Sequence, residues 1–93
     1  MKELHELLEE VTDKESFLIF SNALVKDREP HEGKTTDEVG FVDDWANNSI
    51  WGYLESAVAW AEDSNFGENQ KKELKNNPWG QFAAFLYCGK IYE

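Results

Sequence analysis

The chain has 93 residues, of which 41% are hydrophobic and 14% aromatic, and its formal net charge is −10. A domain of this length hides only about two-thirds of its extended surface on folding, so we expect one domain over residues 1–93 with a dense core. The excess of acids disfavours binding to nucleic acid or to an anionic membrane surface, because both require clustered cations.

The first helix is predicted from four apolar residues at positions i, i+3, i+4 and i+7, namely Leu4, Leu7, Leu8 and Val11. A second helix should begin at Thr12, because Thr12 and Glu15 have the spacing of a capping box. Its buried side is expected to hold Phe17, Phe20 and Leu24, widened by Leu18 and Val25. Pro30 should end this helix, since the residue before a proline avoids the helical conformation.

Residues 30–48 are polar and contain two glycines, so we expect a long loop between the second and third helices. A loop of this length in a small domain is usually functional or mobile. Residues 39–42 are a candidate short strand within it.

The third helix should be capped by Asn48 or Ser49. Its apolar stripe is predicted to comprise Ile50, Tyr53, Leu54, Ala57, Val58 and Ala61, with Trp60 on the flank. The segment after it is polar, and residues 68–75 are a candidate short helix with little apolar surface to hold it in place.

The fourth helix should start with Asn77 as its cap and Pro78 in its first position. It is apolar nearly all round, which is typical of a helix at the centre of a domain. Gly89 is expected to end it in the left-handed conformation, and Ile91 and Tyr92 to fold back onto the core. The sequence thus predicts a compact, all-α, four-helix domain.

Negative charge is concentrated in mid-chain, since no Lys or Arg occurs between Lys34 and Lys71. Acidic residues alternate there with tryptophans, a pattern that favours a surface for a basic protein. The field would steer the partner, and the aromatic side chains would anchor it. The candidate partner-binding residues are Asp43, Asp44, Trp45, Trp51, Glu55, Glu62 and Asp63.

The alternative interpretation is that the acids only solvate the domain and the aromatic residues are core. We expect Tyr53 and Trp60 to be core, and leave Trp45 and Trp51 open between the two interpretations. Glu62 and Asp63 fall at the predicted end of the third helix, where the macrodipole disfavours acids. Either an external basic partner compensates them, or three lysines of the same chain do, Lys71, Lys72 and Lys75.

No catalytic, metal or cofactor motif is complete, so we expect a protein that is not an enzyme. Gly33 is followed by Lys and Thr, but Arg28 stands where a phosphate-binding loop needs glycine. A calcium loop beginning at Asp44 would have Ser49 at its glycine position. Two histidines and one cysteine do not give zinc-ligand spacing. Cys88 lies in the apolar fourth helix, which predicts a buried, unreactive thiol.

A lone cysteine cannot form an internal disulfide, and the first residues are acidic where a signal peptide would be basic. The longest apolar run, at residues 82–88, is far shorter than the roughly 20 residues of a membrane span. These features predict a soluble cytoplasmic protein.

Three blocks of the sequence are similar to a family of small bacterial proteins of unknown function. They are VTDKESF at residues 11–17, AWAEDS at residues 59–64, and NPW, FA, LY and GKIYE within residues 77–93. The resemblance implies a bacterial, cytoplasmic, stand-alone domain without an assigned activity. It transfers no site residue.

Our leading hypothesis is a noncatalytic domain that binds a basic protein, and its sharpest version is an immunity or antitoxin-like inhibitor of a cationic toxin. The competing hypothesis is a small enzyme or ligand-binding domain. Its cleft would lie between the third helix and the loop at residues 30–48, lined by Trp45, Trp51, Glu55 or Glu62. A third hypothesis is a homodimer that forms through exposed aromatic residues.

Overall fold

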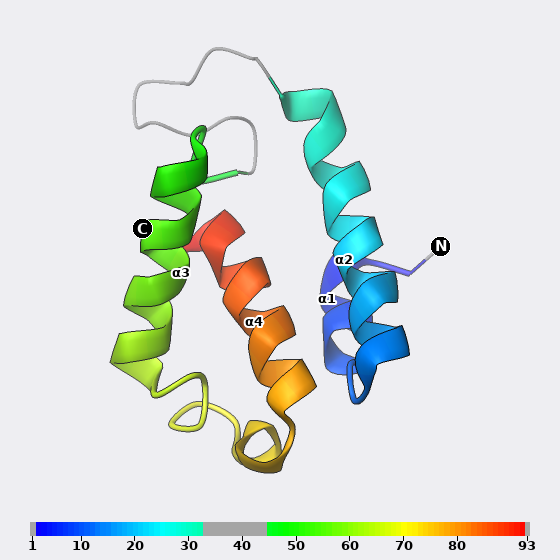
Figure 1. The fold of residues 1–93 in the computed structure, drawn as a ribbon, viewed down its shortest axis with the longest axis vertical. Coiled ribbons are helices and arrows are strands. Elements are labelled where there is room, and N and C mark those ends of the chain that lie inside the picture. Colours follow the sequence, from blue (N-terminus) through cyan, green and yellow to red (C-terminus); the bar gives the residue numbers. More distant parts are fainter. Residues whose placement is uncertain (1, 33–44, 93) are drawn as a thin grey trace.

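The structure, a computed structural model, describes residues 2–32 and 45–92 and has the predicted all-α architecture (Figure 1). Its helices are α1 (Leu4–Glu9), α2 (Lys14–Arg28), the 3₁₀ helix η1 (Glu29–His31), α3 (Ile50–Ser64), the 3₁₀ helix η2 (Lys72–Asn76) and α4 (Pro78–Ile91). The four predicted helices are thus confirmed, and of the predicted loop at residues 30–48 the structure describes residues 30–32 and 45–48. The candidate strand at residues 39–42 lies outside the described residues.

Helix α4 is the central element of the domain, as its all-round apolar character predicts. It contacts α1, α2 and α3, and Figure 1 shows it between α3 on one side and the α1–α2 pair on the other. Close approach is possible because small residues of α4 are buried, namely Gly80, Ala83, Ala84 and Gly89. Of the helices within residues 2–32 and 45–92, none combines the length and apolar character that a membrane span requires.

The core divides into two clusters, one on each side of α4. The first lies toward α1 and α2 and comprises Val11, Phe20, Leu24, Trp45 and Ala83. The second lies toward α3 and comprises Trp60, Ala61 and Ala84, with Phe85, Cys88 and Tyr92 packed against it. The return of Tyr92 onto the core was predicted, whereas Ile91 is largely exposed.

Side-chain caps begin three of the four α-helices, and two of these caps are the predicted ones. Ser49 caps α3, and Asn77 caps α4 with Pro78 in the first position. The predicted capping box of α2 is wrong by one residue. Asp13 is the cap, its carboxylate accepting from Ser16 N at 2.9 Å while Ser16 Oγ accepts from Asp13 N at 3.1 Å. Aspartate is the stronger capping residue, and the hydrogen bonds that its carboxylate accepts from Ser16 N and Ser16 Oγ lower its pKa.

Gly89 does not end α4 in the left-handed conformation, so that prediction is wrong. The helix continues to Ile91, and Gly89 packs against the Tyr53 ring of α3. A Cβ at this position would lie 2.7 Å from Tyr53 Cε1. The phenol is fixed in turn, because its hydroxyl donates to Leu86 O at 2.7 Å. Close packing, rather than a backbone angle, therefore requires glycine here.

The predicted buried faces of α2 and α3 are too wide. Ile50, Leu54 and Val58 of α3 are exposed, as are Leu18 and Val25 of α2. The buried residues of α3 are instead Ala57, Trp60, Ala61 and Ser64, with Trp60 at one edge of the buried arc. An indole has more apolar surface to bury than an aliphatic side chain. The orientation of α3 that buries Trp60 therefore leaves part of the predicted apolar stripe in contact with solvent. The candidate helix at residues 68–75 is only the 3₁₀ turn η2.

Candidate functional site

The outward side of α3 carries a tryptophan and two acids on one narrow face. At about 100° of rotation per residue, Trp51, Glu55, Val58 and Glu62 fall within about 60° of one another. All four side chains are exposed, and Trp51 retains 71% of its accessible surface. We call these four residues the acidic α3 face.

Apolar surface adjoins this face along one side, and no positive charge interrupts it. Ile50 and Leu54 lie next to Trp51 and Val58 around the helix and are exposed too. The helix Ile50–Ser64 has no lysine or arginine. A large exposed aromatic residue beside apolar and acidic side chains is a composition that suits a protein interface.

Glu62 and Asp63 lie at the end of α3, the part of the helix where compensation by nearby lysines was one of two expectations. Within residues 2–32 and 45–92, no ion pair joins either acid to Lys71, Lys72 or Lys75. Asp63 instead accepts a hydrogen bond from the hydroxyl of Tyr92, which raises the pKa of that phenol. The intramolecular ion pairs that were one of two expectations for these acids are therefore not formed.

The remaining candidate partner-binding residues are Asp43, Asp44 and Trp45. Asp43 and Asp44 fall outside the described residues. Trp45 retains only 4% of its accessible surface, so its indole is part of the core and not of the exposed surface. Its ring lies 6.0 Å from that of Tyr53, between centroids.

Trp45 is held by a network of charged groups at the ends of α2 and α4. Its Nε1 donates to Asp27 Oδ2 at 3.0 Å, and the same oxygen accepts from Lys90 Nζ at 2.8 Å. The Arg28 guanidinium lies 5.1 Å from the ring centroid, a distance at which cation–π attraction is significant. These contacts fix Trp45, and with it the segment that leads into α3, against α2.

Hydrogen bonds of Asn47 and its neighbours fix the segment between Trp45 and α3. Ala46 N donates to Lys90 O at 2.7 Å, and Asn47 Nδ2 donates to Ser56 Oγ and to Gly89 O. Arg28 donates to Asn47 O and Asn48 Oδ1, both at 3.1 Å. These contacts join three helices at one end of the domain.

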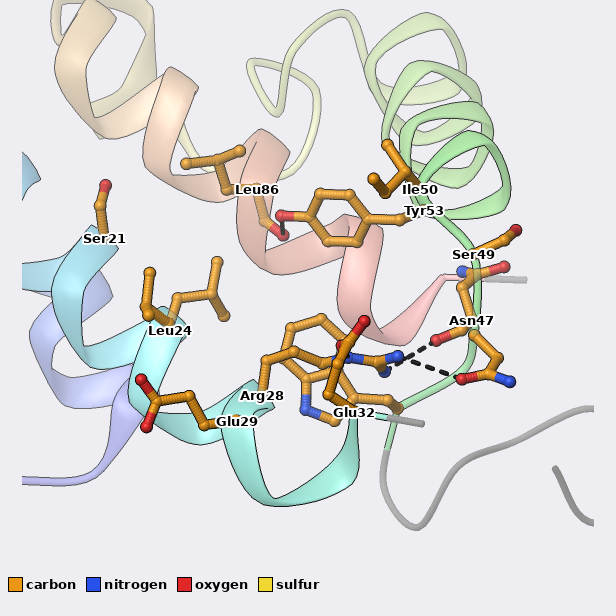
Figure 2. Close-up of a pocket in the computed structure, with 13 residues that line it drawn as sticks. Ser21, Leu24, Arg28, Glu29, Glu32, Asn47, Ser49, Ile50, Tyr53 and Leu86 are labelled. Atoms are coloured by element: carbon orange, nitrogen blue, oxygen red, sulfur yellow. Dashed lines mark hydrogen bonds and ion pairs between the residues drawn. The ribbon is translucent and has the colours of Figure 1, made fainter. Parts of the chain in front are cut away.

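A cavity of about 520 Å³ opens between α2 and the start of α3, and Leu86 of α4 also lines it (Figure 2). Its walls are mainly apolar. Figure 2 shows Leu24 on one side, Ile50 and Tyr53 on the other, and Arg28 at the base. The lining residues are Ser21, Leu24, Val25, Arg28, Glu29, Glu32, Trp45, Asn47, Asn48, Ser49, Ile50, Tyr53 and Leu86.

The cavity lies near the position of the predicted cleft, but it is lined by different residues. Trp45 does line it, whereas Trp51, Glu55 and Glu62 do not. The wall contributed by α2 was not foreseen. One signal for it was present in the sequence, because Ser21 interrupts the apolar side of α2 between Phe17, Phe20 and Leu24.

The described residues offer little for acid–base or metal chemistry. Residues 2–32 and 45–92 contain no group of three or more side chains placed to hold a metal ion. Burial raises the pKa of the Cys88 thiol to about 11 and that of the Tyr53 phenol to about 12. Both groups are therefore protonated at neutral pH, and the Cys88 thiol is a poor nucleophile.

A small all-α domain with an acidic helix face and an apolar cavity is thus the class of protein that the geometry defines. The model of a family of unknown function, DUF7660, matches residues 13–93, and the chain belongs to this family. No curated protein matches the chain significantly, and no solved structure does either.

Proposed function

We propose that this protein is a noncatalytic binding domain whose acidic α3 face binds a basic protein. The observation that carries the proposal is the position of Trp51, 71% exposed, beside Glu55 and Glu62 on a helix without cations. The indole adjoins the exposed side chains of Leu54 and Val58, and a contiguous exposed apolar patch is typical of a protein-interaction site.

Charge and aromatic surface have separate roles in such an interface. The net charge of −10 and the two glutamates attract a cationic partner over a distance, which raises the association rate. Trp51 then becomes buried against the partner, and a central aromatic residue of this kind commonly dominates the binding energy. Val58 and Leu54 extend the apolar contact along one side of it.

The test begins with affinity enrichment from the native host, in which the wild-type chain is compared with a Glu55→Gln/Glu62→Gln variant. A protein enriched by the first and lost with the second is then purified, and its association kinetics are measured against salt. We expect the double variant to lower the association rate about tenfold at low salt and to flatten its salt dependence. Trp51→Ala should raise the dissociation rate instead.

A Glu9→Gln/Glu73→Gln variant is the matched control. Both of its acids are exposed and lie on other elements, and it removes the same amount of charge. Equal losses in the two double variants would show that only net charge matters, which contradicts an assignment to α3. Unchanged binding after Trp51→Ala would remove the tryptophan from the interface.

In its sharper form, the proposal makes this domain an immunity or antitoxin-like inhibitor of a cationic toxin in the bacterial cytoplasm. Its small size and strong negative charge support this version, and the unpaired Cys88 fits a reducing compartment. Co-expression with a cationic toxin encoded by a neighbouring gene tests it. Protection of the host by wild-type protein, reduced by the Glu55/Glu62 variant, is the expected result.

A further inference from the structure

We infer that the acidic α3 face binds an amphipathic α-helix of its partner, which carries lysine or arginine residues along the edge of its apolar stripe. This inference rests on the proposed function and adds the chemistry of the surface that the partner presents. In Figure 1, α3 forms one edge of the domain, with α4 on its inner side. Of the helices in the described part of the chain, α4 is the only one that α3 packs against, so the outer side of α3 is open to a further helix.

The exposed apolar residues of α3 have the spacing of a helix–helix contact. Trp51, Leu54 and Val58 follow one another at i, i+3 and i+7, and they retain 71%, 45% and 47% of their accessible surface. Apolar residues with this spacing form the contact between the helices of a two-stranded coil. An extended segment repeats its side chains about every 7 Å, which fits the rises of about 4.5 and 6 Å along this stripe less well than a second helix does.

Glu55 and Glu62 determine the sign of the charge that the partner helix must carry beside its apolar stripe. If Trp51 and Val58 are the a positions of a heptad, Leu54 is a d position and both glutamates are e positions. Residues at e positions pair with charged residues of the opposite helix and set the choice of partner. In the part of the chain that the structure describes, neither glutamate forms an ion pair. Their charges are therefore available to the lysine or arginine side chains of a second helix.

A second copy of this chain is a poorer occupant of the acidic α3 face than a basic helix. Because α3 contains no lysine or arginine, neither a parallel nor an antiparallel pair of α3 helices would give the two glutamates a cation. Two molecules of net charge −10 also repel each other. A basic helix supplies the positive charge that α3 lacks, including at its last turn, where the helix dipole favours cations.

The test uses three synthetic peptides of about 21 residues, or three heptads, as probes in a heteronuclear NMR titration of the full chain. The first peptide has leucine at its a and d positions and lysine at e and g. The second has glutamate in place of lysine, and the third has the composition of the first with its leucines spread around the helix. We expect the first to bind at least about tenfold more tightly than either of the others, with saturable shifts centred on the exposed residues of α3. Circular dichroism should show that this peptide gains helix on binding.

Charge reversal on the protein tests the role of the two glutamates. In Glu55→Lys/Glu62→Lys, the ratio of the affinities for the lysine and glutamate peptides should fall at least about tenfold. Glu9→Lys/Glu73→Lys is the matched control, because it changes the net charge by the same amount at exposed positions of other elements. This control should keep the ratio within about threefold of its wild-type value. Trp51→Ala should weaken the lysine peptide at least about tenfold, and circular dichroism verifies that each variant is folded.

Three results would overturn the inference. One is the absence of saturable binding by the lysine peptide, and another is equal binding of the peptide whose leucines are spread around the helix, since charge alone would then explain the attraction. The third is an equal fall of the affinity ratio in the two double variants. Enrichment from the native host with Glu55→Gln/Glu62→Gln tests the proposed function separately. If a partner is lost with that variant while no peptide binds, the helix is refuted and the proposed function stands.

Discussion

Lys90 Nζ, near the end of α4, lies 2.8 Å from Asp27 Oδ2, near the end of α2. The lysine retains only 6% of its accessible surface, so its charge depends on the protein for compensation. The same Asp27 oxygen accepts from Trp45 Nε1 at 3.0 Å. One carboxylate thus joins α2, α4 and the segment that leads into α3.

Replacing Asp27 by Asn should lower the free energy of unfolding by about 2 kcal/mol, because it leaves the buried Lys90 ammonium undercompensated and weakens the bond to Trp45. Urea denaturation followed by circular dichroism measures the change. Glu29→Gln is the control, because it removes the same charge from an exposed position two residues further along the chain. It should change the free energy of unfolding by less than about 0.5 kcal/mol. Similar losses in the two variants would show that the ion pair is not the cause.

The contact between Gly89 and Tyr53 leads to a second prediction: Gly89→Ala should destabilise the protein, although alanine normally stabilises a helix relative to glycine. Alanine favours a helix over glycine by about 1 kcal/mol. A Cβ at position 89 would nevertheless lie 2.7 Å from Tyr53 Cε1, and the ring is held by Leu86. Overpacking of this kind costs about 1–3 kcal/mol, so Gly89→Ala should destabilise the protein by about 1 kcal/mol.

In a Tyr53→Leu background the ring is absent, and Gly89→Ala should then stabilise the protein by a few tenths of a kcal/mol or more. The melting temperatures of the four proteins in this double-mutant cycle provide the measurement. If Gly89→Ala destabilises both backgrounds equally, the ring is not what excludes a side chain.

These contacts show which parts of the fold can be predicted from sequence. Helix starts depend on neighbouring residues, and residue type alone identified Asn77 as one cap and Ser49 as one of two candidates, with Asn48, for another. Burial depends on what packs against a helix. The apolar arc of α3 is wider than the surface that α4 covers, so Ile50 is 80% exposed despite its place in the predicted stripe.

The candidate site shows the same division. Trp51, Glu55 and Glu62 share a face because they are spaced by four and seven residues, and this spacing is visible in the sequence. The burial of Trp45 follows from Asp27, 18 residues earlier. Pairing over such separations leaves no local pattern, and neither does the cavity, which forms between helices distant in the sequence.

Asn77 has two functions that can be separated by mutation. Its Oδ1 accepts from Gly80 N at 3.1 Å to cap α4, while its Nδ2 donates to Val11 O at 2.7 Å. Asn77→Ala loses both bonds and should cost about 2 kcal/mol, whereas Asn77→Asp keeps the cap and should cost about 1 kcal/mol. Ser49→Ala removes only a cap and should also cost about 1 kcal/mol. Chemical denaturation measures the free energy of unfolding of the three variants. Equal losses of stability in Asn77→Ala and Ser49→Ala would show that the hydrogen bond to Val11 O does not contribute.

Burial of Cys88 and Tyr53 predicts a loss of stability at alkaline pH. Their pKa values rise from 9.0 and 10.0 to about 11 and about 12. Between pH 9 and 12 the unfolded chain therefore holds fewer protons than the folded protein, so stability falls as pH rises through this interval. Below pH 9 these two groups should cause no change. Cys88→Ala should remove the early part of the decline, and denaturation midpoints measured at several pH values test this.

The thiol itself offers an independent measurement of the same shift. Because the thiolate is the reactive form, a pKa near 11 should slow the reaction of Cys88 with a disulfide reagent at pH 8 by roughly ten- to a hundredfold relative to the unfolded chain. Stopped-flow or manual mixing of the protein with the reagent, in buffer and in about 6 M guanidinium, gives the rates for the folded and the unfolded chain. Equal rates would mean that the thiol is not held in its neutral form by the packing around α4, and the alkaline transition would then have another origin.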